Sequence, residues 1–145
     1  MKFLFKKISI SSDHAGFKLK EEIKKNLKKK KIKVLDFGPT TDKSVDYPDF
    51  AKKVARSISS KRSNVGILVC GSGTGMAMSA NKLKKIRAAV CYNEASTRLS
   101  RLHNNANILA LGARLTMYSK AIKLVNIFLS TKFEGGRHLK RVKKV

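Results

Sequence analysis

Hydrophobic and polar positions follow two alternating patterns along this chain. Short runs rich in isoleucine, valine and leucine alternate with segments in which apolar residues recur every three or four positions. The short runs predict strands at residues 7–11, 33–37, 66–70, 86–91 and 108–112. The helical spacing is carried by Leu19, Ile23 and Leu27; by Phe50, Val54 and Ile58; by residues 74–83; by Ala95, Leu99 and Leu102; and by Tyr118, Ile122, Val125 and Leu129.

Strict alternation of strands and helices predicts a parallel sheet, because each helix crosses one face of the sheet between two strands. The expected fold class is therefore α/β, a three-layer Rossmann-like or flavodoxin-like sandwich with a five-stranded parallel sheet. We expect a C-terminal helical extension if residues 135–142 continue as a helix. The length of 145 residues, with 42% hydrophobic residues, suits one domain over 1–145.

The segment GILVCGSGTG, residues 66–75, carries the most specific chemistry of the sequence. An apolar strand ends at Cys70, and alternating glycines then expose backbone N–H groups to a ligand. A cysteine at the end of a strand is often only a small core residue, but the glycines favour a reactive thiol beside an anion site. The loop lacks the Lys-Ser/Thr of a P-loop and the third glycine of a dinucleotide fingerprint.

Three other groups follow predicted strands or helices, and each has a structural alternative. Asp13 and His14 precede a helix that Ser12 or Asp13 would cap. The Asp46–Asp49 segment would start a helix with proline in its first turn. His103 and its polar neighbours crowd a helix end, where a histidine also interacts with free carbonyls. We expect all of these groups to open onto one rim of the sheet together with Cys70.

The charge of the chain is its most unusual bulk property. A formal net charge of +24 raises nucleic acids, anionic membranes and phosphorylated small molecules as partners. Seven lysines between residues 24 and 33, with few aromatic residues among them, favour a solvated helix face over a nucleic-acid site. Two cysteines without metal-ligand spacing predict reduced thiols and no metal site, and we expect a cytoplasmic protein with no membrane partner.

Several blocks of the sequence together resemble the ribose-5-phosphate isomerase B family. They are SDHAGFKLKEEI, DFGPTTDKSVDYPDFA, GILVCGSGTGMAMSANK, IRAA, RLSRLHNNANILALGAR and FEGGRHLKRV, which cover nearly the whole chain. The resemblance implies an aldose–ketose isomerase that opens ribose 5-phosphate and forms ribulose 5-phosphate through a cis-enediolate, without metal or cofactor. A 6-phosphate hexose such as galactose or allose 6-phosphate remains an alternative substrate. A basic nucleic-acid-binding module is the remote alternative.

The resemblance also implies roles for individual residues. Cys70 would be the base that moves the proton between C1 and C2, His103 the ring-opening acid and Asp13 its partner. The substrate-binding residues would be His14, Tyr47, Gly71, Ser72, Gly73, Thr74, Gly75, Asn104, Arg114, Arg137 and Arg141, with His14 and the three arginines on the phosphate. The family implies a homodimer whose sites lie at the subunit interface, with a tetramer left open.

Three positions depart from the usual wording of the family. Ser72 replaces a threonine, Thr74 stands where an aliphatic residue is frequent, and Asn105 replaces an aspartate near His103, which removes a charge there. Some members use a glutamate in the glycine loop as the base. Here position 75 is glycine and position 70 is cysteine, so the chain resembles the cysteine type.

Overall fold

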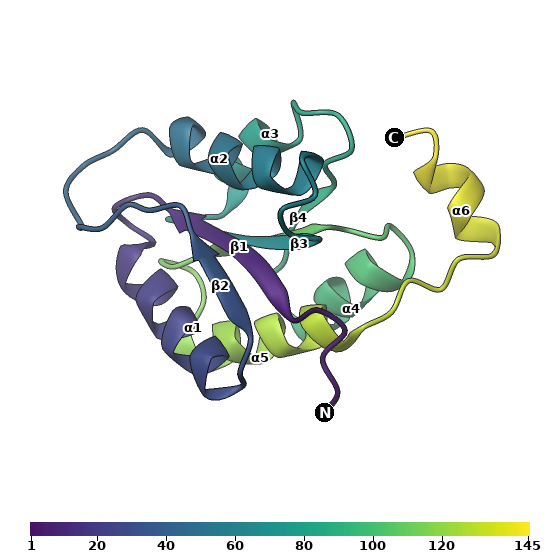
Figure 1. Cartoon of the computed structure of the whole chain (residues 1–145), viewed down its shortest axis with the longest axis horizontal. Helices are drawn as coiled ribbons and strands as arrows, with labels where there is room; N and C mark the ends of the chain where they lie inside the picture. The colour runs from purple at the N-terminus through teal and green to yellow at the C-terminus, as the bar shows by residue number, and fades with distance from the viewer.

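The computed structural model describes residues 1–145 and shows one parallel five-stranded sheet between two layers of helices (Figure 1). The strands are β1 (Lys7–Ser12), β2 (Lys33–Asp36), β3 (Val65–Cys70), β4 (Ala88–Val90) and β5 (Ile108–Gly112). The helices are α1 (Phe17–Lys29), α2 (Tyr47–Ser59), α3 (Thr74–Ala80), α4 (Glu94–Leu102), α5 (Tyr118–Ser130) and α6 (Arg137–Val142). The predicted fold class and the C-terminal helix are confirmed.

The strand order is β2-β1-β3-β5-β4, and every pair is parallel. The flavodoxin order would continue from β3 to β4 and then to β5. Here β5, whose five residues are all buried, lies inside the sheet, and the short, half-buried β4 forms the edge. The chain leaves β1 toward β2 and returns to β3 on the other side of β1, so ligands are expected at the carboxyl ends of β1 and β3.

Two hydrophobic clusters hold the layers together. On one face, α1 and α5 pack against the sheet through residues such as Ile10, Leu19 and Phe128. On the other face, α2 and α3 pack against it through residues such as Val54 and Met76. Figure 1 shows these helix layers above and below the strands. The longest helices have 13 residues, and none combines the length and apolarity that a bilayer crossing requires.

The region predicted as a helix over 74–83 and a strand over 86–91 is more irregular than expected. The helix α3 ends at Ala80, and the strand β4 has only three residues. The side chain of Asn81 explains both limits, because its Oδ1 accepts from the N–H of Ala88 at 2.7 Å and its Nδ2 donates to the carbonyl of Ala88 at 3.0 Å. The amide side chain thus takes the place of a neighbouring strand at this edge.

The helix α4 buries a different face from the one that its apolar residues suggest. Thr97, Ser100 and Arg101 are buried, whereas Ala95 is exposed and Leu99 is 44% exposed. The guanidinium of Arg101 reaches inward and donates to the carbonyl of Thr131 at 3.1 Å and to the carbonyl of Ala106. Burial and the nearby Arg87 lower the pKa of Arg101 to about 10, so the group stays charged at neutral pH.

Candidate active site

Cys70 lies at the end of a strand that is buried throughout, and its side chain faces the glycine loop. Its Sγ accepts a hydrogen bond from the N–H of Gly73 at 3.0 Å. Gly73 has a φ of +84°, and an added Cβ would lie 3.0 Å from the backbone of Leu111. This glycine therefore permits both the turn and the contact between its amide and the thiol. The predicted juxtaposition of thiol and backbone donors is confirmed.

A cavity of about 300 Å³ opens beside Cys70. Its lining residues are Asp13, Tyr47, Cys70, Gly71, Ser72, Gly75, Arg114 and Leu115. Seven of these eight residues are among the site residues predicted from the sequence. Leu115 is the exception, because a single exposed leucine after a strand carries no chemical signal.

Two glycines of the loop make room for side chains that line the cavity. A Cβ on Gly71 would lie 3.1 Å from the guanidinium of Arg114, and a Cβ on Gly75 would lie 2.8 Å from the ring of Tyr47. The backbone N–H of Arg114 donates to the carbonyl of Gly71 at 3.0 Å, which ties the β5–α5 loop to the Cys70 loop. The glycines are thus needed for close approach as well as for backbone donors.

We expect Gly75→Ala to weaken ligand binding in the cavity without unfolding the protein. The added methyl group displaces the ring of Tyr47, which is 42% exposed and free to swing outward, so the cost falls on the cavity and not on the core. KM for the substrate should rise about tenfold, since a shift of an ångström in a binding group has effects of this order or larger. Steady-state kinetics and a thermal melt of the variant measure the two quantities, and an unchanged KM would contradict the packing argument.

Asp13 and His14 both have structural partners in addition to their predicted roles. Oδ1 of the buried Asp13 accepts from the N–H of Gly16 at 3.0 Å and so fixes the turn before α1. The N-cap of α1 is Gly16 without a side-chain cap, so the capping alternative for Ser12 or Asp13 is wrong, and Asp13 lines the cavity. Nδ1 of His14 accepts from the N–H of Val45 at 3.2 Å. Since a neutral imidazole that accepts at Nδ1 carries its proton on Nε2, His14 keeps one donor for an anion.

His103 does not lie with Cys70, and the expectation of one shared rim is wrong for its group. His103 and Asn104 line a second, larger groove of about 1200 Å³, together with Arg141, and this groove shares no residue with the cavity beside Cys70. The reason is the direction of α4. A helix of a parallel α/β fold runs back against the strands, so His103, at the end of α4, lies at the amino edge of the sheet, opposite the edge where Cys70 lies.

The C-terminal helix α6 places the two remaining phosphate candidates on the solvent side of this groove. Arg137 and Arg141 lie four positions apart on α6, and both are exposed. Positions i and i+4 share a helix face, so the two guanidinium groups suit one dianion. The predicted pairing of Arg137 and Arg141 is therefore met within α6, but Arg114 lies at the other cavity.

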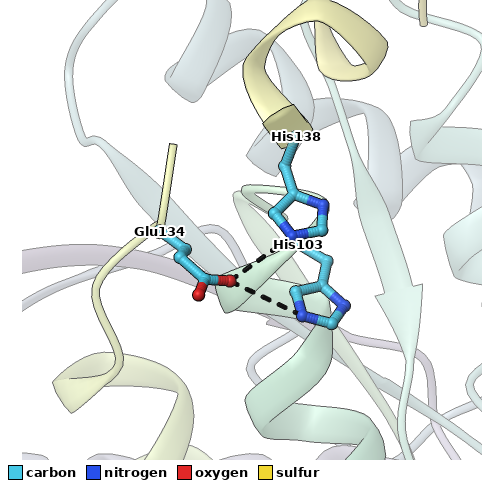
Figure 2. A group of neighbouring side chains, drawn as sticks. All are labelled: His103, Glu134 and His138. Atoms are coloured by element: carbon cyan, nitrogen blue, oxygen red, sulfur yellow. Dashed lines mark ion pairs between the residues drawn. The ribbon is translucent and has the colours of Figure 1, made fainter. Parts of the chain in front are cut away.

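Two residues that sequence reasoning overlooked surround His103 (Figure 2). Its ring stacks on that of His138, with the centroids 4.2 Å apart and the planes 13° from parallel. Oε2 of Glu134 lies 3.6 Å from Nε2 of His103 and 3.4 Å from Nε2 of His138. The FEGGRH block contained the signal, since a glutamate and a histidine four positions apart meet on one side of a turn.

The same three side chains contain donor atoms within 4.8 Å of one another. An imidazole binds a metal ion in the plane of its ring, and two rings stacked 4.2 Å apart direct their lone pairs along parallel planes. In this arrangement the two histidines do not converge on one ion. The cluster is therefore built for contact between the rings and the carboxylate.

Asn105, which replaces the aspartate usual in the family, has its own place beside this cluster. Its φ is +46°, a left-handed conformation that asparagine tolerates, and its Oδ1 accepts from Nη1 of Arg101 at 3.0 Å. The neutral side chain is thus turned toward the buried arginine. The carboxylate that contacts His103 comes from Glu134 instead.

Comparisons with known proteins show which family the chain resembles along almost its full length. The chain is 41% identical over 140 residues to ribose-5-phosphate isomerase B of Escherichia coli, covering 97% of this chain and 94% of that protein. A ribose 5-phosphate isomerase from Thermotoga maritima is 52% identical and superposes with a TM-score of 0.94 over 95% of each chain. Ribose-5-phosphate isomerase B of Mycoplasma genitalium, solved with bound ribulose-5-phosphate, is 45% identical with a TM-score of 0.91, covering 95% of this chain and 92% of that one.

The family model described as Ribose/Galactose Isomerase matches residues 8–145, which include every strand except the first residue of β1 and every candidate site residue. With this match, and with relatives of more than 40% identity along almost the full length of the chain, the protein belongs to the Ribose/Galactose Isomerase family.

Proposed function

We propose that this protein interconverts ribose 5-phosphate and ribulose 5-phosphate at a site centred on Cys70. The observation that carries the proposal is the Cys70 thiol, hydrogen-bonded to a loop amide and facing a cavity that also holds Asp13 and Arg114. Membership of the Ribose/Galactose Isomerase family and the likeness to a relative with bound ribulose-5-phosphate support the same substrate.

The proposed chemistry is one proton transfer in each direction. The Cys70 thiolate removes the C2 proton of the open-chain aldose. The electron pair of that bond forms the C1–C2 double bond, and the π pair of the C1 carbonyl moves onto O1, which gives a cis-enediolate. The thiol then returns the proton to C1 while the proton of the O2 hydroxyl passes to O1 and the C2 carbonyl forms, which yields the ketose and restores the thiolate. The backbone N–H groups from Gly71 to Gly75 stabilise the negative oxygens, and donors of this kind lower barriers by about 3 to 4 kcal/mol in other enzymes.

We propose that the remaining groups reach this sugar from a second copy of the chain. Within one copy, His103 and Arg141 lie in a groove at the opposite edge of the sheet from Cys70. A homodimer that sets the groove of one copy against the cavity of the other supplies a ring-opening acid and a pair of arginines. Leu115, which lines the cavity, and the nearby Met117 are exposed apolar residues that such a contact would cover.

The phosphate of the substrate would then be held by His14 and Arg114 of one subunit and by Arg137 and Arg141 of the other. We expect Arg141→Ala to raise KM for ribose 5-phosphate about tenfold to a hundredfold while kcat changes little. The phosphate does not react, so its contacts are equally strong in the bound substrate and in the transition state. Lys140→Ala removes the same charge from the same helix and serves as the matched control, with KM unchanged.

A comparison of substrates tests the proposed function. The purified chain is assayed with ribose 5-phosphate, galactose 6-phosphate and allose 6-phosphate in the presence of a chelator. Rapid formation of ribulose 5-phosphate, with little turnover of the hexose phosphates, supports the proposal. Turnover of a hexose phosphate alone would keep the mechanism and replace the substrate, and no turnover of any sugar phosphate would overturn the proposal.

A further inference from the structure

The cluster around His103 contains two further side chains, those of Glu134 and His138, beside the proposed ring-opening acid. His103 ends α4, whereas Glu134 and His138 come from the segment that leads into α6, and all three side chains meet at one point (Figure 2). Resting on the proposed function, we propose that Glu134 and His138 are positioning residues that hold the His103 imidazole in one orientation.

The backbone around the cluster is fixed at several points, so the contact does not depend on side chains alone. Nε of Arg101 donates to the carbonyl of Thr131 at 3.1 Å, and the N–H of Glu134 donates to the carbonyl of Leu102 at 3.0 Å. These bonds tie the α5–α6 segment to the end of α4, immediately before His103. The segment is thereby aligned before α6 begins.

Two glycines then turn the chain so that Glu134 and His138 face the same point. Gly135 and Gly136 have φ values of +70° and +52°, and a Cβ on either would meet no atom within 4 Å. The glycines are therefore required by backbone conformation and not by space. The resulting turn brings His138 back toward the carboxylate of Glu134, four positions earlier.

Burial and charge both disfavour a proton on His138. Its side chain is 8% exposed, whereas that of His103 is 38% exposed, and one carboxylate faces both rings. Burial, together with the positive charges of His103, Arg137 and Arg141, lowers the pKa of His138 against the opposite effect of Glu134. The buried ring is therefore suited to stack on His103 and not to donate a proton itself.

The other charged groups near His103 and His138 are positive, which makes the carboxylate of Glu134 more important. The ionisable residues that line the groove, apart from the two histidines, are all basic: Lys82, Lys84, Lys85, Arg87, Arg141 and Lys143. These cations oppose a protonated histidine. The carboxylate of Glu134 is the negative charge that offsets them at His103.

The test separates ring opening from the proton transfer at Cys70. Ribulose 5-phosphate has no hydroxyl group placed to close a furanose ring, so its C1 proton exchanges with deuterium from D₂O through Cys70 without any ring step. Net conversion of ribose 5-phosphate needs both steps. For Glu134→Gln we expect the rate of conversion of ribose 5-phosphate to fall about tenfold or more, within the range for a general acid. The rate of deuterium exchange into ribulose 5-phosphate should stay within about twofold of the wild-type rate.

A second pair of variants tests the stacked ring. His138→Phe keeps an aromatic ring against His103, whereas His138→Ala removes it, so we expect the phenylalanine variant to recover most of the conversion lost in the alanine variant. Glu94→Gln removes an exposed carboxylate of α4 that pairs with Lys123, and is the matched control with unchanged kinetics.

The outcomes distinguish this proposal from the proposed function. If Glu134→Gln and His138→Ala convert ribose 5-phosphate like the wild type, or lose exchange and conversion equally, the positioning role is wrong while the isomerase assignment stands. If the wild-type protein itself neither converts ribose 5-phosphate nor exchanges the C1 proton of ribulose 5-phosphate, the proposed function fails. A selective loss of conversion in these variants, largely recovered in His138→Phe, supports both.

Discussion

Replacement of Cys70 by alanine should lower the isomerase rate by at least about a thousandfold. The sulfur lies at the end of β3, lines the cavity and accepts a hydrogen bond from the N–H of Gly73 in the glycine loop. Alanine fits the buried strand end, so the fold should remain intact. A discontinuous assay for ribulose 5-phosphate, with circular dichroism of the same sample, measures rate and fold together.

Cys91→Ala is the matched control for this variant. Cys91 is the other free and buried cysteine, and burial raises the pKa of its thiol, which keeps it protonated and unreactive at neutral pH. Its replacement should leave the rate near that of the wild type. If Cys70→Ala retained more than a tenth of the wild-type rate, the base would have to be another residue of the cavity, with Asp13 the first to examine.

A mixture of two inactive variants should regain activity. His103→Ala and Cys70→Ala each remove one of the two groups that the proposed dimer brings together from different subunits. In a mixed dimer, one of the two sites has Cys70 from one chain and His103 from the other, whereas the second site lacks both. Random assortment makes half of the dimers mixed, so the rate should recover to about a quarter of the wild-type value.

The recovery depends on exchange of subunits, so the two variants are unfolded together and refolded, or expressed together. Mixing Cys70→Ala with Arg114→Ala is the control, because both residues line the same cavity of one chain. In that mixture every site lacks one of the two groups. With ribose 5-phosphate well below the KM of Arg114→Ala, which lacks a phosphate contact, the rate should stay low. Recovery in the control equal to that in the test would contradict the assignment of residues to subunits.

The sheet and the Cys70 cavity were predictable because they depend on local signals. The run from Val65 to Cys70 is fully buried, as a continuous apolar strand in a parallel sheet should be, and the glycines after it can only form a loop. The residues at the carboxyl ends of β1 and β3 follow from the chain order alone. The strand order needed more than sequence, since the half-buried β4 and the buried β5 differ too little in length and composition to show which lies at the edge.

The face of α4 and the place of His103 were beyond local signals. Apolar periodicity predicted the wrong face of α4, because the inward residue is Arg101. Its buried guanidinium donates to carbonyls of Ala106, five residues away, and of Thr131, on another segment. The position of His103 depends on the direction of α4 across the sheet. The proposed dimer would account for this position, because it sets His103 of one copy against Cys70 of the other.

The lysines also show what the sequence alone does not reveal, because exposed and buried lysines look alike in it. Most of the lysines between residues 24 and 33 are exposed, as a solvated helix face requires. Lys20 has the same spacing and charge in the sequence, but its side chain is fully buried and donates to Asp36 at 3.0 Å and to the carbonyl of Pro39 at 2.9 Å. Only the partners on β2 and in the loop after it distinguish this lysine from its neighbours, and composition does not contain them.

A crystal structure of the purified protein with ribulose 5-phosphate bound tests the central claim most directly. The account predicts one sugar phosphate between two copies of the chain, with C1 and C2 beside the sulfur of Cys70 from one copy. His103 and Arg141 from the other copy should contact the same molecule. A sugar phosphate held by one copy alone, or bound in the groove of His103 with Cys70 out of reach of C1 and C2, would contradict it.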